Sequence, residues 1–403
     1  MNPASATPSA TKSLAPDLRE PRGRLVNLVN PDHPATHSLK TFGYAIVDIC
    51  TPERAAELCN ESWLDLEGLG TAISRELPST WMNDRWPQQT HGLLQNQQFG
   101  LRLGTCLARL ETRSFWEALF NGKRCISSFD ATSVARPDSQ ERTYKSELKS
   151  MEKNGESVLL ASWLHTDQAK FRTECLRHIQ MAFALVDLGE GEQRTQVVIP
   201  KEGETLQSLR DRFLEEFPPV AVEKGRFDPE RSEWVKHTVE ERKWLIENAR
   251  VITPTLKAGQ AILWDSGAAH ASIPGALPDG KKTRNMRMSV FVSALPIELV
   301  DKADIEVRQQ MLENGDTSGH RVTTNGKTAK KPFIQCKFPK IGQTFGAELP
   351  DFCNNRVVSG FKRAYENGEE DSVAYKIAEF CGGYGYKRPR EDSVVVFGKR
   401  AKK

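Results

Sequence analysis

The sequence has no long run of apolar residues. Mainly apolar stretches, such as residues 44–49 and 394–397, fall far short of the roughly 20 residues that a membrane-spanning helix needs. The N-terminus also lacks the continuous apolar core of a secretory signal. We therefore expect no membrane partner and a cytoplasmic or nuclear location.

Clustered cysteines are missing too, and there is little excess charge of either sign. The eight cysteines are spread through 403 residues without a CxxC pair. This pattern is typical of reduced thiols, and it argues against a disulfide framework and against a cysteine-based zinc site. The formal net charge is only +3, so overall charge does not indicate a nucleic-acid partner.

The exception to this balance is the C-terminal tail, residues 387–403, which carries two basic clusters. Such a tail can bind a nuclear import receptor or lie on phosphate groups. It can equally be a solubilising, disordered end of the chain. Both interpretations stand at this point.

The chain is long enough for one large enzyme domain with extensions. Short strand-like segments occur on both sides of one helical insertion, which predicts a mainly β fold with flanking helices and a barrel-like core. We divide the chain into a disordered N-terminal arm rich in Pro, Ser, Ala and Thr (1–37), a main domain (38–300) that contains the helical insertion (204–248), a C-terminal extension (301–386) and the basic tail (387–403).

A helix start signal follows the first predicted strand of the main domain. The segment TFGYAIVDI has the apolar and β-branched content of a strand. Thr51 and Pro52 come shortly after it, and they are typical of a helix N-cap and a first helical position. We therefore predict a strand that leads directly into a helix.

The segment ASWLHTDQ places His165 and Asp167 two positions apart. On a β-strand, positions i and i+2 point to the same face, so an imidazole and a carboxylate would converge on one point. Taken alone this spacing is weak, because strands offer it often and most histidines bind nothing. A third ligand from elsewhere in the chain is needed to make it informative.

The segment GQAILWDSGAAHASIPG supplies that ligand, with a glycine turn, an apolar strand and His270 at the strand's end. Two histidines and one carboxylate form the facial arrangement that non-haem iron(II) uses, with open positions for a cosubstrate and oxygen. Arg287 follows on the next predicted strand, and its guanidinium can hold the distal carboxylate of a dicarboxylic cosubstrate. The alternatives are a structural role for His270 and an ordinary surface charge at Arg287 or Arg284.

These segments resemble the phytanoyl-CoA dioxygenase-like family of Fe(II)/2-oxoglutarate-dependent oxygenases. The resemblance covers residues 39–295 and includes TFGYAIVDICTPERAAEL, CISSFDA, WLHTDQ and AGQAILWDSGAAHAS. It implies a double-stranded β-helix (a jelly roll, cupin-like), with His165, Asp167 and His270 as catalytic metal ligands. It also implies that Ser272 and Arg287 contact 2-oxoglutarate. The implied cofactors are Fe(II), 2-oxoglutarate as cosubstrate and O2, with ascorbate as an optional supporting reductant.

The sequence departs from the family pattern in one place and keeps it in another. The loop ALPDGKKT lengthens the interval between His270 and Arg287 to 17 positions, and it brings Arg284 into competition for the cosubstrate. Asp167 is retained, whereas related halogenases have a small residue there, so hydroxylation of a small-molecule or lipid-like substrate is favoured. The alternatives are a nuclear oxygenase acting on protein or nucleic acid, and a catalytically silent jelly-roll binding module.

Several other residues have both a functional and a structural interpretation. Gln180 could face the pocket or make an ordinary sheet hydrogen bond. Ser128 or Asp130 could contribute to the pocket rim. Core packing explains Trp163 and Trp264 without further function. The histidines without a carboxylate at a matching spacing are interpreted as structural or surface residues: His91, His178, His237 and His320.

Overall fold

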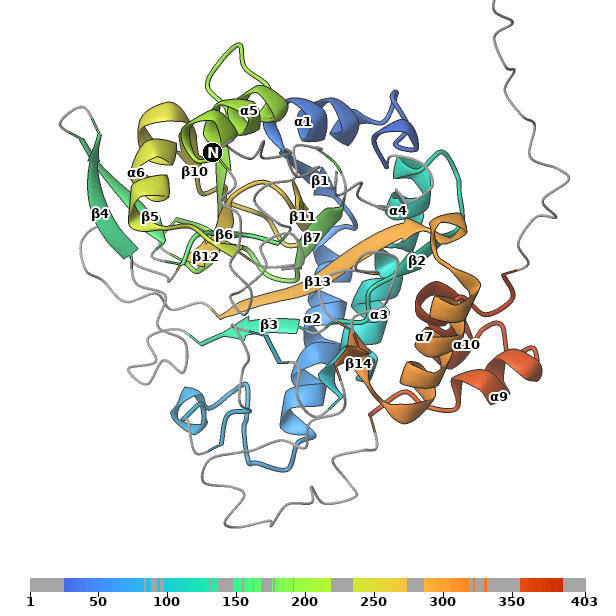
Figure 1. Cartoon of the computed structure of the whole chain (residues 1–403). Coiled ribbons are helices and arrows are strands. Elements are labelled where there is room, and N and C mark those ends of the chain that lie inside the picture. The colour runs from blue at the N-terminus through green and yellow to red at the C-terminus, as the bar shows by residue number, and fades with distance from the viewer. Residues whose placement is uncertain are drawn as a thin grey trace, which may run out of the picture.

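Figure 1 shows the chain as a computed structural model. The described residues are 25–82, 85–87, 93–94, 98–130, 132–136, 148–153, 156–161, 163–167, 176, 178–190, 192–218, 235–273, 286–318, 322, 330–331 and 356–386. Arg284, His91, His320 and the basic tail at 387–403 lie outside them. Within the described residues, no helix combines the length and the apolar character needed to cross a membrane.

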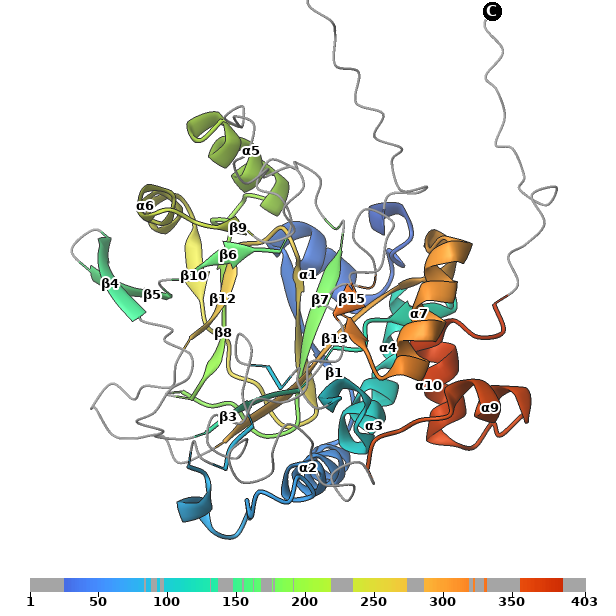
Figure 2. The ribbon, with the colours of Figure 1, turned by 60° about the horizontal axis from the view of Figure 1, so that its bottom comes forward.

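Two antiparallel sheets form the centre of the molecule (Figures 1 and 2). The larger sheet has the strand order β1 (Tyr44–Asp48), β11 (Gln260–Asp265), β7 (Ile179–Ala184), β13 (Arg287–Pro296) and β2 (Cys125–Ser127), and β3 (Thr132–Ala135) also pairs with β13. The smaller sheet has the order β10 (Arg250–Ile252), β8 (Arg194–Ile199), β12 (His270–Ile273), β6 (His165–Thr166) and β9 (Val235–Lys236). Two further strand pairs are β4 (Leu148–Lys153) with β5 (Glu156–Ala161), and β14 (Thr317–Ser318) with β15 (Lys330–Lys331).

The chain alternates between the two sheets as it passes through the core. It runs from β7 in the larger sheet to β8 in the smaller one, and from β10 through β11, β12 and β13 it changes sheet at every step. This alternation of antiparallel strands is a double-stranded β-helix, or jelly roll, so the predicted mainly β fold with flanking helices is confirmed. Apolar side chains from both sheets, among them Ala182, Val197 and Trp264, form one cluster between them.

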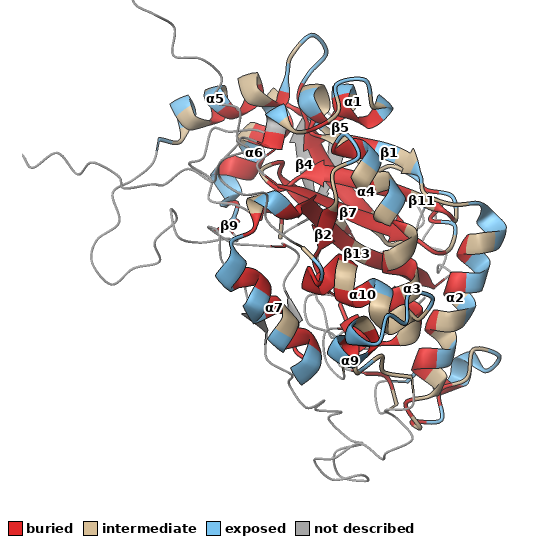
Figure 3. Cartoon of the chain, turned by 90° about the vertical axis from the view of Figure 1, so that its right-hand side faces the viewer, coloured by how far each residue is buried: buried red, intermediate tan, exposed pale blue. Residues whose placement is uncertain are grey.

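Helices pack around the strands, and their buried sides face inward (Figure 3). α5 and α6 pack on the smaller sheet, where Phe213 and Leu245 join a cluster with Leu164 and Val198. The helices are α1 (Pro34–Phe42), α2 (Pro52–Glu67), α3 (Leu103–Glu111), α4 (Arg113–Leu119), α5 (Leu206–Glu216), α6 (Val239–Asn248), α7 (Lys302–Asn314), α9 (Phe361–Glu366) and α10 (Val373–Gly382), with 3-10 turns η1 (Leu25–Asn27), η2 (Pro78–Thr80), η3 (Phe99–Leu101) and η4 (Ile297–Leu299).

The predicted strand-to-helix start is confirmed. β1 ends at Asp48, and the side chain of Thr51 accepts a hydrogen bond from the backbone N–H of Arg54 at 3.3 Å, with Pro52 at the first helical position. The cap satisfies one of the backbone N–H groups that a helix start leaves without a partner. β1 then pairs with β11, so this first strand supports the strand that leads to His270.

The prediction of a disordered arm over 1–37 is wrong for residues 25–37. They include η1 and the start of α1, because Leu25 and Val29 are buried in the large apolar cluster that also contains residues of the larger sheet. The backbone N–H of Asn30 donates to the carbonyl oxygen of Leu119 at 2.7 Å and fixes this segment to α4. Residues 1–24 lie outside the described residues.

One strand prediction needs a smaller correction. His270 does not end the strand QAILWD but begins β12, because the chain turns after Asp265 and crosses to the smaller sheet. The Asp265 carboxylate holds this turn by accepting the backbone N–H of Gly267 at 2.8 Å.

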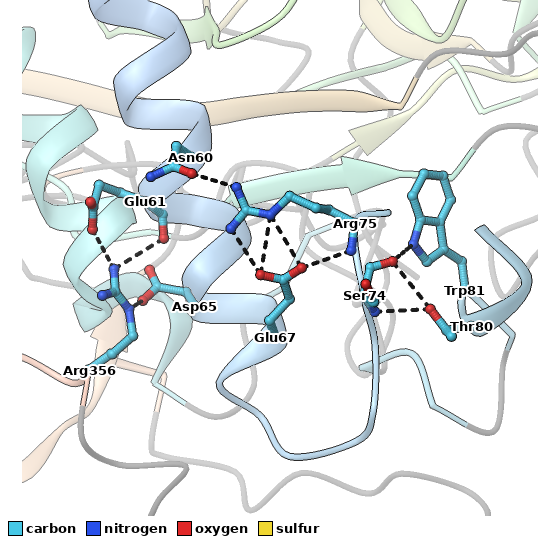
Figure 4. Close-up of polar contacts among 9 residues, drawn as sticks. All are labelled: Asn60, Glu61, Asp65, Glu67, Ser74, Arg75, Thr80, Trp81 and Arg356. Atoms are coloured by element: carbon cyan, nitrogen blue, oxygen red, sulfur yellow. Dashed lines mark hydrogen bonds and ion pairs between the residues drawn. The ribbon is translucent and has the colours of Figure 1, made fainter. Parts of the chain in front are cut away.

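An ion-pair cluster joins the C-terminal part of the chain to α2 (Figure 4). Arg356 Nε donates to Asp65 Oδ1 at 2.7 Å, and its Nη2 donates to Glu61 Oε2 at 2.5 Å. The other oxygen of Asp65 accepts the backbone N–H of Gly104 at 2.7 Å, which brings α3 into the same cluster. Three segments far apart in sequence are therefore held at one place.

A second attachment lies inside the protein at Arg308 on α7. Its guanidinium is fully buried and donates to the backbone carbonyls of Cys381 (2.9 Å), Val322 (2.8 Å) and Ser127. The ring of Phe129 lies 5.0 Å from the guanidinium carbon. Through this side chain α7 and α10 are tied to β2 of the larger sheet.

Candidate active site

The structure brings His165, Asp167 and His270 together at the start of two neighbouring strands. His165 begins β6 and His270 begins β12, and these two residues are direct partners in the smaller sheet. Asp167 follows β6, and its two oxygens lie 3.5 Å from His165 Nε2 and 3.3 Å from His270 Nε2. All three side chains are buried, with one ligand atom from each lying within 4.8 Å of the others. Within the described residues no other group of His, Cys, Asp and Glu has this property.

The backbone determines which nitrogen each histidine presents. His165 Nδ1 lies 3.1 Å from the carbonyl oxygen of Trp163, and His270 Nδ1 lies 2.9 Å from the carbonyl oxygen of Ala268. A carbonyl can only accept, so each Nδ1 carries a proton and each ring presents its Nε2 to the cluster. Two Nε2 atoms beside the Asp167 carboxylate are the donor set of a two-histidine, one-carboxylate metal site.

Backbone hydrogen bonds hold the two ligand-bearing segments against each other. The N–H of Asp167 donates to the carbonyl oxygen of Ser266 at 2.9 Å, and the N–H of Ser266 donates to that of His178 at 2.9 Å. Asp265, which precedes this turn, also accepts the N–H of Leu176 at 2.5 Å. Burial raises the pKa of the Asp265 carboxyl, and these donors together with the nearby Arg210 oppose that shift. The turn before His270 is therefore fixed from both sides.

Arg287 and Ser272, the two residues predicted to contact 2-oxoglutarate, lie side by side. Arg287 begins β13, and its Nη1 donates to Ser272 Oγ at 3.0 Å, with Ser289 Oγ 3.5 Å from its Nε. Arg287 is only 2% exposed, and burial lowers its pKa to about 10. No acidic side chain of the described residues forms an ion pair with it. A buried cation in this state calls for an anionic ligand.

Comparisons with known proteins give only distant similarities. No family model matches the sequence, and no curated protein matches it. Among solved structures, the epimerase SnoN in complex with Fe3+, alpha ketoglutarate and nogalamycin RO is 14% identical, covers 68% of this chain and 84% of its own, and has a TM-score of 0.36. EctD from S. alaskensis is 13% identical, with coverages of 66% and 76% and a TM-score of 0.35. A hypothetical protein of Escherichia coli, JW0805, is 14% identical, with coverages of 71% and 73% and a TM-score of 0.42.

TM-scores of this size do not transfer an activity from one protein to another. The membership of the phytanoyl-CoA dioxygenase-like family therefore stays a prediction from the motifs.

One contact of the site could not be assigned from the sequence. Gln180 on β7 reaches across from the larger sheet, and its Nε2 donates to Asp167 Oδ2 at 2.8 Å. The sequence left open whether this side chain faces the pocket, and the structure places it on a predicted metal ligand. Two aromatic rings also lie close to the histidines. The Trp264 and His270 ring centroids are 5.2 Å apart, and those of Trp163 and His165 are 4.8 Å apart.

Other candidates have structural contacts instead. Ser128 Oγ accepts the backbone N–H of Ser293 at 3.0 Å, so it joins β13 to the segment after β2. The Asp130 carbonyl accepts a hydrogen bond from the buried Arg109. His237 lies 3.5 Å from Glu241 on α6, on the outer side of the smaller sheet. None of these contacts involves the three predicted metal ligands.

Proposed function

We propose that this protein is an Fe(II)- and 2-oxoglutarate-dependent dioxygenase that hydroxylates a small-molecule or lipid-like substrate. The observation that carries the proposal is a buried His-Asp-His cluster beside a buried arginine that has no acidic partner in the described part of the chain. Two imidazoles and one carboxylate suit iron(II), and the guanidinium calls for a carboxylate. A dicarboxylic keto acid has a keto end that can bind the iron and a second carboxylate that can bind the guanidinium.

The spacing between the His-Asp-His cluster and the Ser272–Arg287 pair fits such a cosubstrate. Ser272, which accepts from Arg287, lies two residues after His270 on β12. Two residues of a strand span about 6.6 Å, and both side chains point to the same face. This is the length scale of a five-carbon dicarboxylate. 2-Oxoglutarate could therefore reach the metal ligands with its keto end while its distal carboxylate meets Arg287.

The chemistry that bound iron(II) would supply is the oxidative decarboxylation of 2-oxoglutarate by O2, coupled to hydroxylation of a carbon, with succinate and CO2 as products. His165 and His270 would hold the metal through Nε2, and Asp167 would supply the charged ligand. Arg287 and Ser272 would orient the cosubstrate by its far carboxylate. Ascorbate would serve as a supporting reductant that keeps the iron in its ferrous state.

Substitution of the two histidines tests the proposal. His165→Ala and His270→Ala should abolish iron retention and succinate formation, and circular dichroism should show an unchanged fold. His37→Ala, an exposed histidine on α1, is the matched control and should behave as wild type. The assay contains Fe(II), ascorbate, 2-oxoglutarate and cell extract as a source of substrate. Wild-type turnover in either site variant would remove the proposal, and iron binding without any succinate would favour the silent binding module.

A further inference from the structure

The Asp167 carboxylate has a neighbour that belongs to neither the metal ligands nor the proposed cosubstrate site. Gln180 is the second residue of β7, where it pairs with Trp264 of β11 and Ser293 of β13. Its side chain is 2% exposed and crosses the space between the two sheets. Its Nε2 lies 2.8 Å from Asp167 Oδ2, a normal length for a hydrogen bond to a carboxylate.

The chemistry of the pair fixes the orientation of the amide. An ionised carboxylate can only accept hydrogen bonds, so the NH2 group of Gln180 must face Asp167 and its carbonyl oxygen must face away. That carbonyl oxygen, Oε1, is buried and has no donor within the described chain. A glutamine that served only to link strands would have partners at both ends. Among the described residues, the contact with Asp167 is the only hydrogen bond of this side chain.

We propose that Gln180 is a positioning residue that holds Asp167 as a one-oxygen metal ligand. Both oxygens of Asp167 face the cluster, Oδ1 at 3.5 Å from His165 Nε2 and Oδ2 at 3.3 Å from His270 Nε2. Because Oδ2 accepts the hydrogen bond from Gln180, Oδ1 is the oxygen left without that donor and is the one we assign to the metal. A carboxylate that bound through both oxygens would occupy one more position at the metal, which the cosubstrate and oxygen need. The inference rests on the proposed function, since it assumes that the triad binds a metal.

Metal affinity measured with Co(II) tests this role without turnover. Gln180→Met keeps the length of the side chain and removes its donor. Substitution of a side chain that hydrogen-bonds a metal ligand typically weakens metal binding by about 10- to 100-fold, and we expect a dissociation constant for Co(II) in that range above wild type. The visible spectrum of bound Co(II), which reports coordination number, should change as well. Gln180→Asn, which keeps the amide but is too short to reach, should show the same loss.

Gln196 on β8 is the matched control. It is also 2% exposed, and it pairs with Ala271 next to His270. Its neighbour Val197 is the residue that pairs with His270, so Gln196 points to the opposite face of the sheet, and its Nε2 lies 3.5 Å from Thr253 Oγ1. Gln196→Met should leave the Co(II) dissociation constant within about twofold of wild type. Thermal melting without metal shows whether each variant folds.

A double-mutant cycle separates positioning from a general structural effect. In an Asp167→Ala background, Gln180→Met should weaken Co(II) binding no further, because the carboxylate on which Gln180 acts is gone. Wild-type Co(II) affinity and spectrum in a folded Gln180→Met protein would overturn the inference. So would an equal loss of affinity in the presence and absence of Asp167. If the wild-type protein itself binds no Co(II), the proposed function fails first and the inference fails with it.

Discussion

Arg287 carries a full charge in a buried position, which makes its removal unusually informative. Burial lowers its pKa to about 10, well below the ordinary value of an arginine side chain. At 1.36 kcal/mol per pH unit, this difference of about 2.5 corresponds to about 3 kcal/mol that disfavours the charged form in the folded protein. Because the folded protein releases this proton more readily than the unfolded chain, the folded state bears this cost below pH 10. The free energy of unfolding therefore rises as pH rises through about 10.

Substitution by a neutral residue should therefore separate stability from cosubstrate binding. Arg287→Met removes the buried charge and loses the hydrogen bond to Ser272, a loss of about 1 kcal/mol. The ligand-free protein should be at least as stable as wild type. Truncation of a buried, charge-assisted contact costs about 2 to 5 kcal/mol in binding. Because each 1.4 kcal/mol is tenfold, Arg287→Met and Arg287→Ala should raise the apparent KM for 2-oxoglutarate by roughly 30-fold or more.

Two assays measure these effects. A 2-oxoglutarate titration with succinate as product gives KM. Thermal melting with Mn(II), without turnover, gives the stabilisation by 2-oxoglutarate, which at 100 times the dissociation constant is about 2.7 kcal/mol. Arg287→Lys should have a KM and a thermal stabilisation by 2-oxoglutarate between those of Arg287→Met and wild type, because it keeps the charge but loses the paired donors.

Arg284→Ala is the control for the role assigned to Arg287, and its KM for 2-oxoglutarate should be close to that of wild type. If Arg287→Met keeps the wild-type KM and the wild-type thermal shift, Arg287 does not bind the distal carboxylate of 2-oxoglutarate. A large KM effect in Arg284→Ala alone would move the assignment to Arg284.

Three further predictions concern other parts of the chain. Arg308→Ala should lower the free energy of unfolding by about 3 kcal/mol or more, because it leaves buried carbonyls without donors and opens a cavity; urea denaturation against the exposed control Lys362→Ala measures it, and equal midpoints would refute it. A chain that ends at Tyr386 should keep its iron and its 2-oxoglutarate turnover while losing any nuclear entry that an import receptor provides, and a folded but inactive truncated chain would place the tail in the site. Burial raises the pKa of Cys59 to about 11 and that of Cys106 to about 12. At pH 8 about 0.1% or less of each is thiolate, so both should react slowly with Ellman's reagent, and rapid labelling located by mass spectrometry would contradict this.

The His-Asp-His cluster could be predicted because each of its residues has a local pattern in the sequence. His165 and Asp167 are two positions apart, a spacing that places side chains on one side of an extended segment. His270 follows an apolar strand and a turn, and Arg287 begins the strand after that. Strand alternation then brings residues of the smaller sheet to one face. The fold class was predictable for the same reason, since short alternating strands are visible in the amino-acid pattern.

Features that arise only from tertiary packing have no such local pattern in the sequence. The contact of Gln180 with Asp167 depends on which strands face each other across the two sheets. Order in residues 25–37 depends on burial of Leu25 and Val29 beneath helices that come later in the chain, which overrides a composition that favours disorder. The start of β12 at His270 depends on the turn held by Asp265. Each of these needs the arrangement of the whole fold.

The attachments of the C-terminal part have a consequence for how the protein is made. The Ser127 carbonyl accepts a hydrogen bond from Arg308, which is synthesised 181 residues later. The Asp65 carboxylate accepts one from Arg356, which is synthesised 291 residues later. While the chain emerges from the ribosome, β2 and α2 therefore lack partners that complete their packing. A chain released just after Arg287 would contain all five residues of the proposed site and yet lack these attachments. We expect such a nascent or shortened chain to depend on chaperones, so loss of the part that carries Arg308 and Arg356 should appear first as loss of soluble protein.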